Sequence, residues 1–130
     1  VVSTIKNNWV LLCEAIEGNR YDGHTLKSSL DKVKQMIGVT PKEVHVDKGY
    51  RGNKVEDVKV YISGQKRGVT SSIRKRLKKR QAVEPVISHL KHDHGMSRNY
   101  LFGTIGDKIN ATCAAIGFNL NKLLKIMANA

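Results

Sequence analysis

The sequence predicts a mixed α/β fold, and three observations support this prediction. Short β-branched runs at Val1–Ile5, Glu43–Val46 and Val58–Ile62 have the composition and alternation of strands. Between residues 25 and 37, and again after residue 82, apolar residues recur at helical spacing. Glycine and proline residues separate these segments. The predicted order is β-β-α-β-β-α-α, with no internal repeat.

The first third of the chain predicts a hairpin and a helix. Two apolar runs, Val1–Ile5 and Trp9–Ile16, flank a turn at Lys6–Asn8, which favours an antiparallel pair. Apolar residues then recur every three or four positions from Thr25 to Ile37, and Gly38 is the expected C-cap.

The rest of the chain predicts two strands and two helices. The strand Glu43–Val46 ends at Asp47 and is followed by Lys-Gly-Tyr-Arg-Gly, and Val58–Ile62 is the next strand. A helix over about 82–92 is expected to bury Val83, Val86, Ile87 and Leu90, with Pro85 tolerated only in its first turn. Residues 92–107 have a loop-like composition. A closing helix over about 107–128 places one apolar stripe at Ile109, Cys113, Ile116, Leu120, Leu123 and Met127.

The charge of the chain favours a polyanionic partner. The 130 residues, enough for one domain with a single core, carry a formal net charge of +12. Eight of the lysines and arginines lie between residues 65 and 80, where no acid occurs. This concentration argues against a basic surface that merely aids solubility. Aromatic residues make up only 5%, too few for a platform that stacks single-stranded bases.

Cysteine usage and hydropathy exclude several other classes. Cys13 and Cys113 lie far apart, which argues against a zinc module and favours reduced, buried thiols in a cytosolic protein. No apolar run approaches the length of about eighteen residues that a membrane span requires, and no signal-peptide pattern opens the chain. The chain begins at Val1, without Met and within a strand pattern, which suggests a fragment.

Two carboxylates are candidates for chemistry. Asp47 follows a strand directly, at the place where open α/β sheets bind ligands, and carboxylate oxygens suit Mg²⁺. Asp47 could equally cap the following turn. Glu84 could face Asp47 or simply favour a helix N-terminus, and the second interpretation is the stronger for Glu84 alone. If one helix covers Glu84 and Lys91, they lie two turns apart on one face, where Lys91 is either a phosphate contact or a solvated cation.

Other polar residues favour structural roles. His89, His92 and His94 match no standard zinc spacing, so a polar helix end is the favoured interpretation. Asp22, within YDGHTL, is expected to help start the first helix, and an active-site role is the minority interpretation.

Several motifs together resemble a known family. They are NRYDGHTL, DKGYRG, the KRG and LKKR of the basic segment, AVEPVISHLKHDHGM and INATCAAIGFNLNKLLK. In this order, and over nearly the whole chain, they resemble the C-terminal part of the catalytic domain of bacterial insertion-sequence DDE transposases. The family pattern around the catalytic glutamate is Tyr-x2-Arg-x3-Glu-x6-Lys. Arg80, Glu84 and Lys91 match this pattern, and Leu77 stands at the tyrosine position.

The resemblance implies a ribonuclease-H-like (retroviral-integrase-like) fold, in which helices pack on a mixed sheet, here N-terminally incomplete. It assigns the second catalytic aspartate to Asp47 and the catalytic glutamate to Glu84, both as ligands of Mg²⁺ or Mn²⁺. The first aspartate is expected on a strand upstream of Val1, because Asp22 and Asp31 fall within a helix pattern. Residues 1–130 would then be the C-terminal portion of a catalytic domain, with a basic segment at 65–80.

The implied activity is DNA transposition by two-metal phosphoryl transfer, in which water and then a DNA 3′-hydroxyl attack phosphodiesters. With one ligand missing, the isolated chain is expected to be inactive. The expected partners are double-stranded DNA at transposon ends and target, and further copies of the chain, in the bacterial cytoplasm at the nucleoid and without a membrane. DNA contacts are expected from Lys66, Arg67, Arg74, Lys75, Arg76, Lys78, Lys79, Arg80 and Lys91. The alternatives are a non-catalytic DNA-binding remnant of a transposase and a generic nuclease of the same fold.

Overall fold

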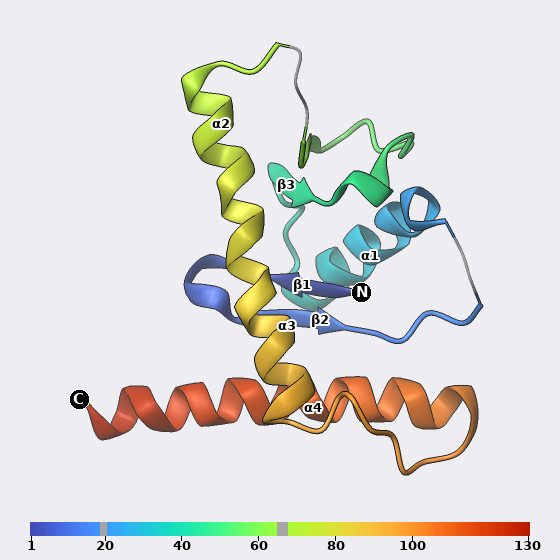
Figure 1. Ribbon diagram of the computed structural model, residues 1–130, viewed down its shortest axis with the longest axis vertical. Helices are drawn as coiled ribbons and strands as arrows, with labels where there is room; N and C mark the ends of the chain where they lie inside the picture. The colour runs from blue at the N-terminus through green and yellow to red at the C-terminus, as the bar shows by residue number, and fades with distance from the viewer. Residues whose placement is uncertain (19–20, 65–67) are drawn as a thin grey trace. The chain divides into compact units, whose positions relative to one another are not determined.

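The computed structural model describes residues 1–18, 21–64 and 68–130, except for the side chains of Arg76 and Arg80 (Figure 1). The chain divides into two compact units. One consists of Val1–Glu17 together with Val83–Ala130, and the other is Gly18–Ala82.

The first unit begins with the predicted antiparallel hairpin. Strand β1 (Val2–Thr4) pairs with β2 (Val10–Cys13), and Val2 lies opposite Cys13. The turn is a short 3-10 helix, η1 (Lys6–Asn8), in which Asn7 and Asn8 have positive φ angles of 63° and 57°. Asparagine tolerates this left-handed conformation better than most residues, so the Asn-Asn pair is suited to the turn. The second strand is shorter than the predicted run of residues 9–16.

Helices α3 (Val83–His92) and α4 (Gly103–Ala128) complete the core of this unit. Val86 and Leu90 of α3 are buried with Ala111 and Ala114 of α4 and with Val10 and Cys13 of β2. The prediction for α3 is confirmed for Val86 and Leu90, whereas Val83 and Ile87 are only partly buried. Pro85 lies in the first turn of α3, where its missing N–H breaks no helical hydrogen bond.

Helix α4 differs from its prediction in two ways. It begins at Gly103, four residues before the expected Asp107, so the end of the predicted loop is helical. Gly106 permits this start, because a Cβ atom there would lie 2.7 Å from the Leu101 Cβ. The predicted apolar stripe is also not the packed face: all six of its residues are exposed, and the small Ala111 and Ala114 face the core instead. Small side chains let two elements approach closely, which apolar periodicity does not reveal.

The second unit holds α1 and a parallel strand pair. Helix α1 (Asp22–Ile37) starts three residues earlier than predicted and ends, as predicted, at Gly38, whose φ is 71° and whose N–H donates to Lys34 O. Strand β3 (Glu43–Val46) has the predicted bounds, and β4 (Lys59–Ile62) lacks only Val58 of the predicted strand. The two strands run parallel, with Glu43 opposite Lys59 and Val46 opposite Ile62.

Much of the basic segment is helical, which the sequence interpretation did not anticipate. Helix α2 (Ser71–Lys78) continues into a 3-10 helix, η3 (Lys79–Ala82). Thr70 begins the helix, because its hydroxyl accepts from Ile73 N and its carbonyl accepts from Arg74 N. Repulsion between the cations does not prevent helix formation.

Three further expectations can be compared with the described part of the chain. A single mixed sheet was expected, but two separate two-stranded sheets are present there. Cys13 and Cys113 are both free thiols; Cys13 is buried as expected, whereas Cys113 is exposed because it lies on the outer face of α4. No helix within the described ranges has the length and apolarity needed to cross a membrane.

Candidate functional site

The parallel pairing of β3 and β4 brings two polar side chains together at one edge of the sheet. Since Val46 lies opposite Ile62, the next residues, Asp47 and Ser63, both leave the sheet at its carboxyl end. The Ser63 N–H donates to Val46 O (2.9 Å), and its hydroxyl donates to Asp47 Oδ1 (3.3 Å). The Asp47 carboxylate is therefore oriented by a residue 16 positions further along the chain.

Asp47 also caps the turn that follows it. The backbone N–H of Lys48 donates to Asp47 Oδ1 at the start of the 3-10 helix η2 (Lys48–Tyr50). Asp47 is exposed in this arrangement. The turn-capping interpretation is thus confirmed, and it is compatible with a functional role because an exposed carboxylate can still reach a ligand.

The start of α1 packs against this turn. The Tyr21 hydroxyl donates to Arg51 O, and the Tyr50 side chain is partly buried. The pKa of Tyr50 is raised by burial and, to a smaller extent, by the charges of Asp22 and Asp47. Asp22, expected mainly to help start a helix, therefore also lies in the electrostatic environment of the Asp47 turn.

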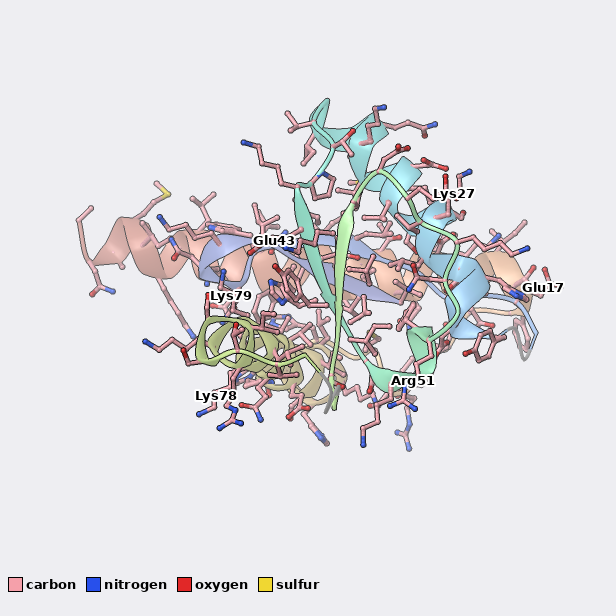
Figure 2. All side chains as sticks on the ribbon, turned by 90° about the horizontal axis from the view of Figure 1, so that it is seen from above. Glu17, Lys27, Glu43, Arg51, Lys78 and Lys79 are labelled. Carbon is pink, nitrogen blue, oxygen red and sulfur yellow. The ribbon has the colours of Figure 1, made fainter. Side chains whose placement is uncertain are left out.

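Helical basic residues form an exposed surface in the same unit. Arg74, Lys75, Lys78 and Lys79 are exposed on α2 and η3. Lys79 Nζ lies 3.2 Å from Glu43 Oε1, which links the basic segment to β3 (Figure 2). This exposed pair contributes little to stability but limits the orientations of η3. The expected contacts Lys66 and Arg67, and the side chains of Arg76 and Arg80, lie outside the described part of the structure.

The second candidate acid belongs to the other unit. Glu84 lies in the first turn of α3 and Lys91 in its last turn, and both are exposed. Because one helix covers both residues, they are two turns apart on one face, as the sequence predicts. Asp47 and Glu84 are in different units, so their proximity stays a prediction.

The histidine-rich end of α3 contains a short hydrogen bond between a histidine and an aspartate. His89 Nδ1 lies 2.6 Å from Asp93 Oδ2, and this hydrogen bond lowers the pKa of Asp93. His89 and His94 also contact the Phe118 ring of α4. Within the described residues, no group of three or more His, Cys, Asp or Glu side chains is arranged to hold a metal ion.

Sequence reasoning missed Ser63, Lys48 and Glu43. A usable signal for Ser63 was its position directly after a strand, because the residues that follow neighbouring parallel strands share an edge. For Lys48, the only signal in the sequence was its position directly after Asp47. The contact between Glu43 and Lys79 joins residues 36 positions apart, and no local pattern announces it.

This α/β unit carries an exposed aspartate at the end of a parallel strand and an exposed basic helix. Such an arrangement is suited to a polyanionic substrate. Residues 46–124 match the family described as "Transposase DDE domain", which covers more than half of the chain. The chain therefore belongs to the DDE transposase family, whose role is DNA transposition and whose domains generally use a divalent metal. No curated protein and no solved structure matches the chain.

Proposed function

We propose that this chain is the C-terminal portion of the catalytic domain of a bacterial insertion-sequence transposase. Its fold would be ribonuclease-H-like, and its branch would be that of the Tyr-x2-Arg-x3-Glu-x6-Lys pattern. The observation that carries the proposal is Asp47, an exposed carboxylate at the end of a parallel strand and inside the family match. In this proposal Asp47 and Glu84 act together in phosphodiester cleavage and strand transfer.

The donor chemistry of these residues fits Mg²⁺ or Mn²⁺. Asp47 and Glu84 both present exposed carboxylate oxygens, which hard divalent cations prefer. A bound ion would supply Lewis-acid stabilisation of the charge that develops on the phosphate. Ser63 supports this role, because its hydrogen bond restricts the rotation of the Asp47 carboxylate. The first aspartate of the acid triad would come from outside residues 1–130, so the chain alone would be inactive.

The basic segment would hold double-stranded DNA through its phosphates. Four exposed cations on α2 and η3 support this role, together with the family's DNA substrate. Such contacts are largely independent of sequence and weaken as salt rises. Lys91, two turns from Glu84, would contact a phosphate near the second acid. The working assembly would contain several copies of the chain, in the bacterial cytoplasm at the nucleoid.

The decisive experiment uses a protein in which an upstream strand with an aspartate is restored. Cleavage of a plasmid carrying the transposon ends is measured in Mg²⁺ for Asp47→Asn and Glu84→Gln. Both variants should fall to background, because each loses a charged oxygen ligand. The matched controls, Asp57→Asn and Glu17→Gln, change exposed acids elsewhere and should retain activity.

Survival of cleavage in Asp47→Asn or Glu84→Gln would refute the catalytic assignment. The alternative, a non-catalytic DNA-binding remnant, would then account for the basic surface. Cleavage of plasmids lacking transposon ends at an equal rate would indicate a generic nuclease. Mg²⁺-dependent cleavage by the 130-residue chain alone would contradict the proposal that it lacks one catalytic acid.

A further inference from the structure

We propose that the Lys48–Arg51 loop is a second DNA-phosphate contact site, beside Asp47, and that the first turn of α1 holds this loop in its binding conformation. This inference rests on the proposed function, since it names how the DNA reaches the carboxylate. It also assigns a role to YDGHTL, the motif that the catalytic proposal leaves without one.

Lys48 and Arg51 are exposed cations, one and four residues after Asp47 in the chain. A DNA phosphate that approaches a carboxylate is repelled unless positive charge lies nearby. The Lys48 side chain lies against the backbone at the end of β4, since a Cβ atom at Gly64 would be 3.2 Å from Lys48 Nζ and in contact with Cε. Gly64 directly follows Ser63, whose hydroxyl donates to Asp47. The Lys48 side chain thus lies at the sheet edge that carries Asp47.

The carbonyl of Arg51 anchors the other end of the loop. It accepts a hydrogen bond from the Tyr21 hydroxyl at the start of α1. Gly23, in the first turn of α1, permits this approach: a Cβ atom there would lie 3.0 Å from Arg51 O and 2.7 Å from the Tyr21 ring. A side chain at residue 23 would push the loop away from the helix.

The middle of the loop is held in a similar way. A Cβ atom at Gly49 would lie 2.5 Å from Asp22 Oδ2, so the absence of a side chain at residue 49 lets the loop backbone pass the Asp22 carboxylate without displacing it. Burial and the charge of Asp22, in the first turn of α1, raise the pKa of the partly buried Tyr50. The loop is therefore ordered by α1 before any ligand binds, and a loop ordered in advance loses less conformational entropy on binding.

A plainer interpretation is that Lys48 and Arg51 are solvated cations on a rigid turn. The two interpretations differ in salt dependence, because each lysine or arginine that contacts a phosphate adds about 0.9 to the slope of log K against log salt. A solvated cation that contacts no phosphate adds far less. The comparison therefore needs a control pair with the same charge at another place in the same unit.

The experiment measures binding of the 130-residue chain to a fluorescent DNA duplex of arbitrary sequence, by anisotropy over a range of salt concentrations. The test variant is Lys48→Gln with Arg51→Gln. The charge-matched control is Lys27→Gln with Lys34→Gln, two exposed lysines on α1 (Figure 2 labels Lys27 and Arg51). The test variant should reduce the slope by about 1.8 and weaken binding roughly 30-fold at 0.15 M salt. The control should leave the slope unchanged.

Two further variants separate charge from loop order. The exchange Lys48→Arg with Arg51→Lys keeps both charges, so its salt slope should equal that of the unsubstituted chain. Tyr21→Phe removes the hydroxyl that anchors Arg51 O but no charge, so it should weaken binding severalfold without changing the slope. Circular dichroism confirms that each variant is folded.

The outcomes distinguish this inference from the proposed function. An unchanged slope in the loop variant, or an equal loss in the control, would overturn the loop as a phosphate site. Arg74→Gln with Lys75→Gln on α2 tests the basic segment separately. If that pair lowers the slope and the loop variant does not, the proposed DNA surface stands and the inference fails. If only the loop variant lowers it, the inference stands and the assignment of α2 fails.

Discussion

Replacement of Leu90 by alanine should destabilise the unit that carries Glu84. Leu90 is 0% exposed and packs within the core that joins α3, α4 and β2. The change removes three carbon groups worth about 0.8 kcal/mol each, or about 2.4 kcal/mol of transfer free energy. The residual cavity raises the expected loss in the free energy of unfolding to about 3–4 kcal/mol. This is a large part of the stability of a small unit.

The measurement is urea unfolding followed by the fluorescence of Trp9, the single tryptophan, which belongs to the same unit. With a urea dependence of about 1.5 kcal/mol per molar, the midpoint should fall by roughly 2 M. Leu123→Ala on α4 is the matched control, because Leu123 is 44% exposed and the substitution is chemically identical. Its midpoint should hardly change.

Equal midpoint shifts for Leu90→Ala and Leu123→Ala would refute the described packing of α3. If Leu90→Ala is unfolded without urea, Leu90→Met keeps the test measurable, since a similar-sized side chain costs less than about 1.5 kcal/mol. Leu90→Met should then still unfold at lower urea than the unsubstituted chain, and Leu123→Met should not.

Two other predictions concern polar contacts in the same unit. Asn119 donates to Val10 O (2.8 Å) and accepts from Val10 N (3.0 Å), so Asn119→Ala should cost about 1–3 kcal/mol in urea unfolding because it leaves partly buried backbone groups unpaired. Asn121→Ala, an exposed change on the same helix, should cost nothing, and an equal cost would contradict the role of Asn119. The pKa of Asp93 is lowered from its ordinary value of 3.8, mainly by the hydrogen bond with His89. This interaction therefore stabilises the folded protein at pH values above 3.8, and the stabilisation is lost as the pH falls through the folded-state pKa of Asp93. A carbon-13 NMR titration should give a pKa for the Asp93 carboxyl that is below its ordinary value, and the His89→Ala variant should have an Asp93 pKa closer to that value. Identical titration curves in the unsubstituted and variant proteins would rule out the hydrogen bond with His89 as the cause.

Several elements could be predicted because local chemistry specifies them. The alternation in β3 and the periodicity in α1, ended by Gly38, depend only on residues close in sequence. The carboxylate candidates Asp47 and Glu84 could likewise be found from their positions at the end of a strand and the start of a helix. Their catalytic assignment comes from the family pattern and stays a prediction.

The features that could not be predicted depend on long-range contacts. Apolar periodicity predicted the wrong face of α4 as the packed face. A stripe of large apolar side chains does not reveal that the small Ala111 and Ala114 allow the closest approach to the core. The helical state of α2 was also not predicted, for a local reason: its only apolar residues are Ile73 and Leu77, and like charges close together along a helix are unfavourable.

The sequence by itself indicated the DDE transposase family and predicted a polyanionic partner, because motif order and net charge do not depend on how the chain folds. Only the tertiary structure showed that Ser63 hydrogen-bonds to Asp47 and that the first turn of α1 packs against the Lys48–Arg51 loop. Strand direction and register decide the first contact, and the absence of a Cβ at Gly23 and Gly49 permits the second. Both join segments whose proximity results from folding and not from their spacing along the chain.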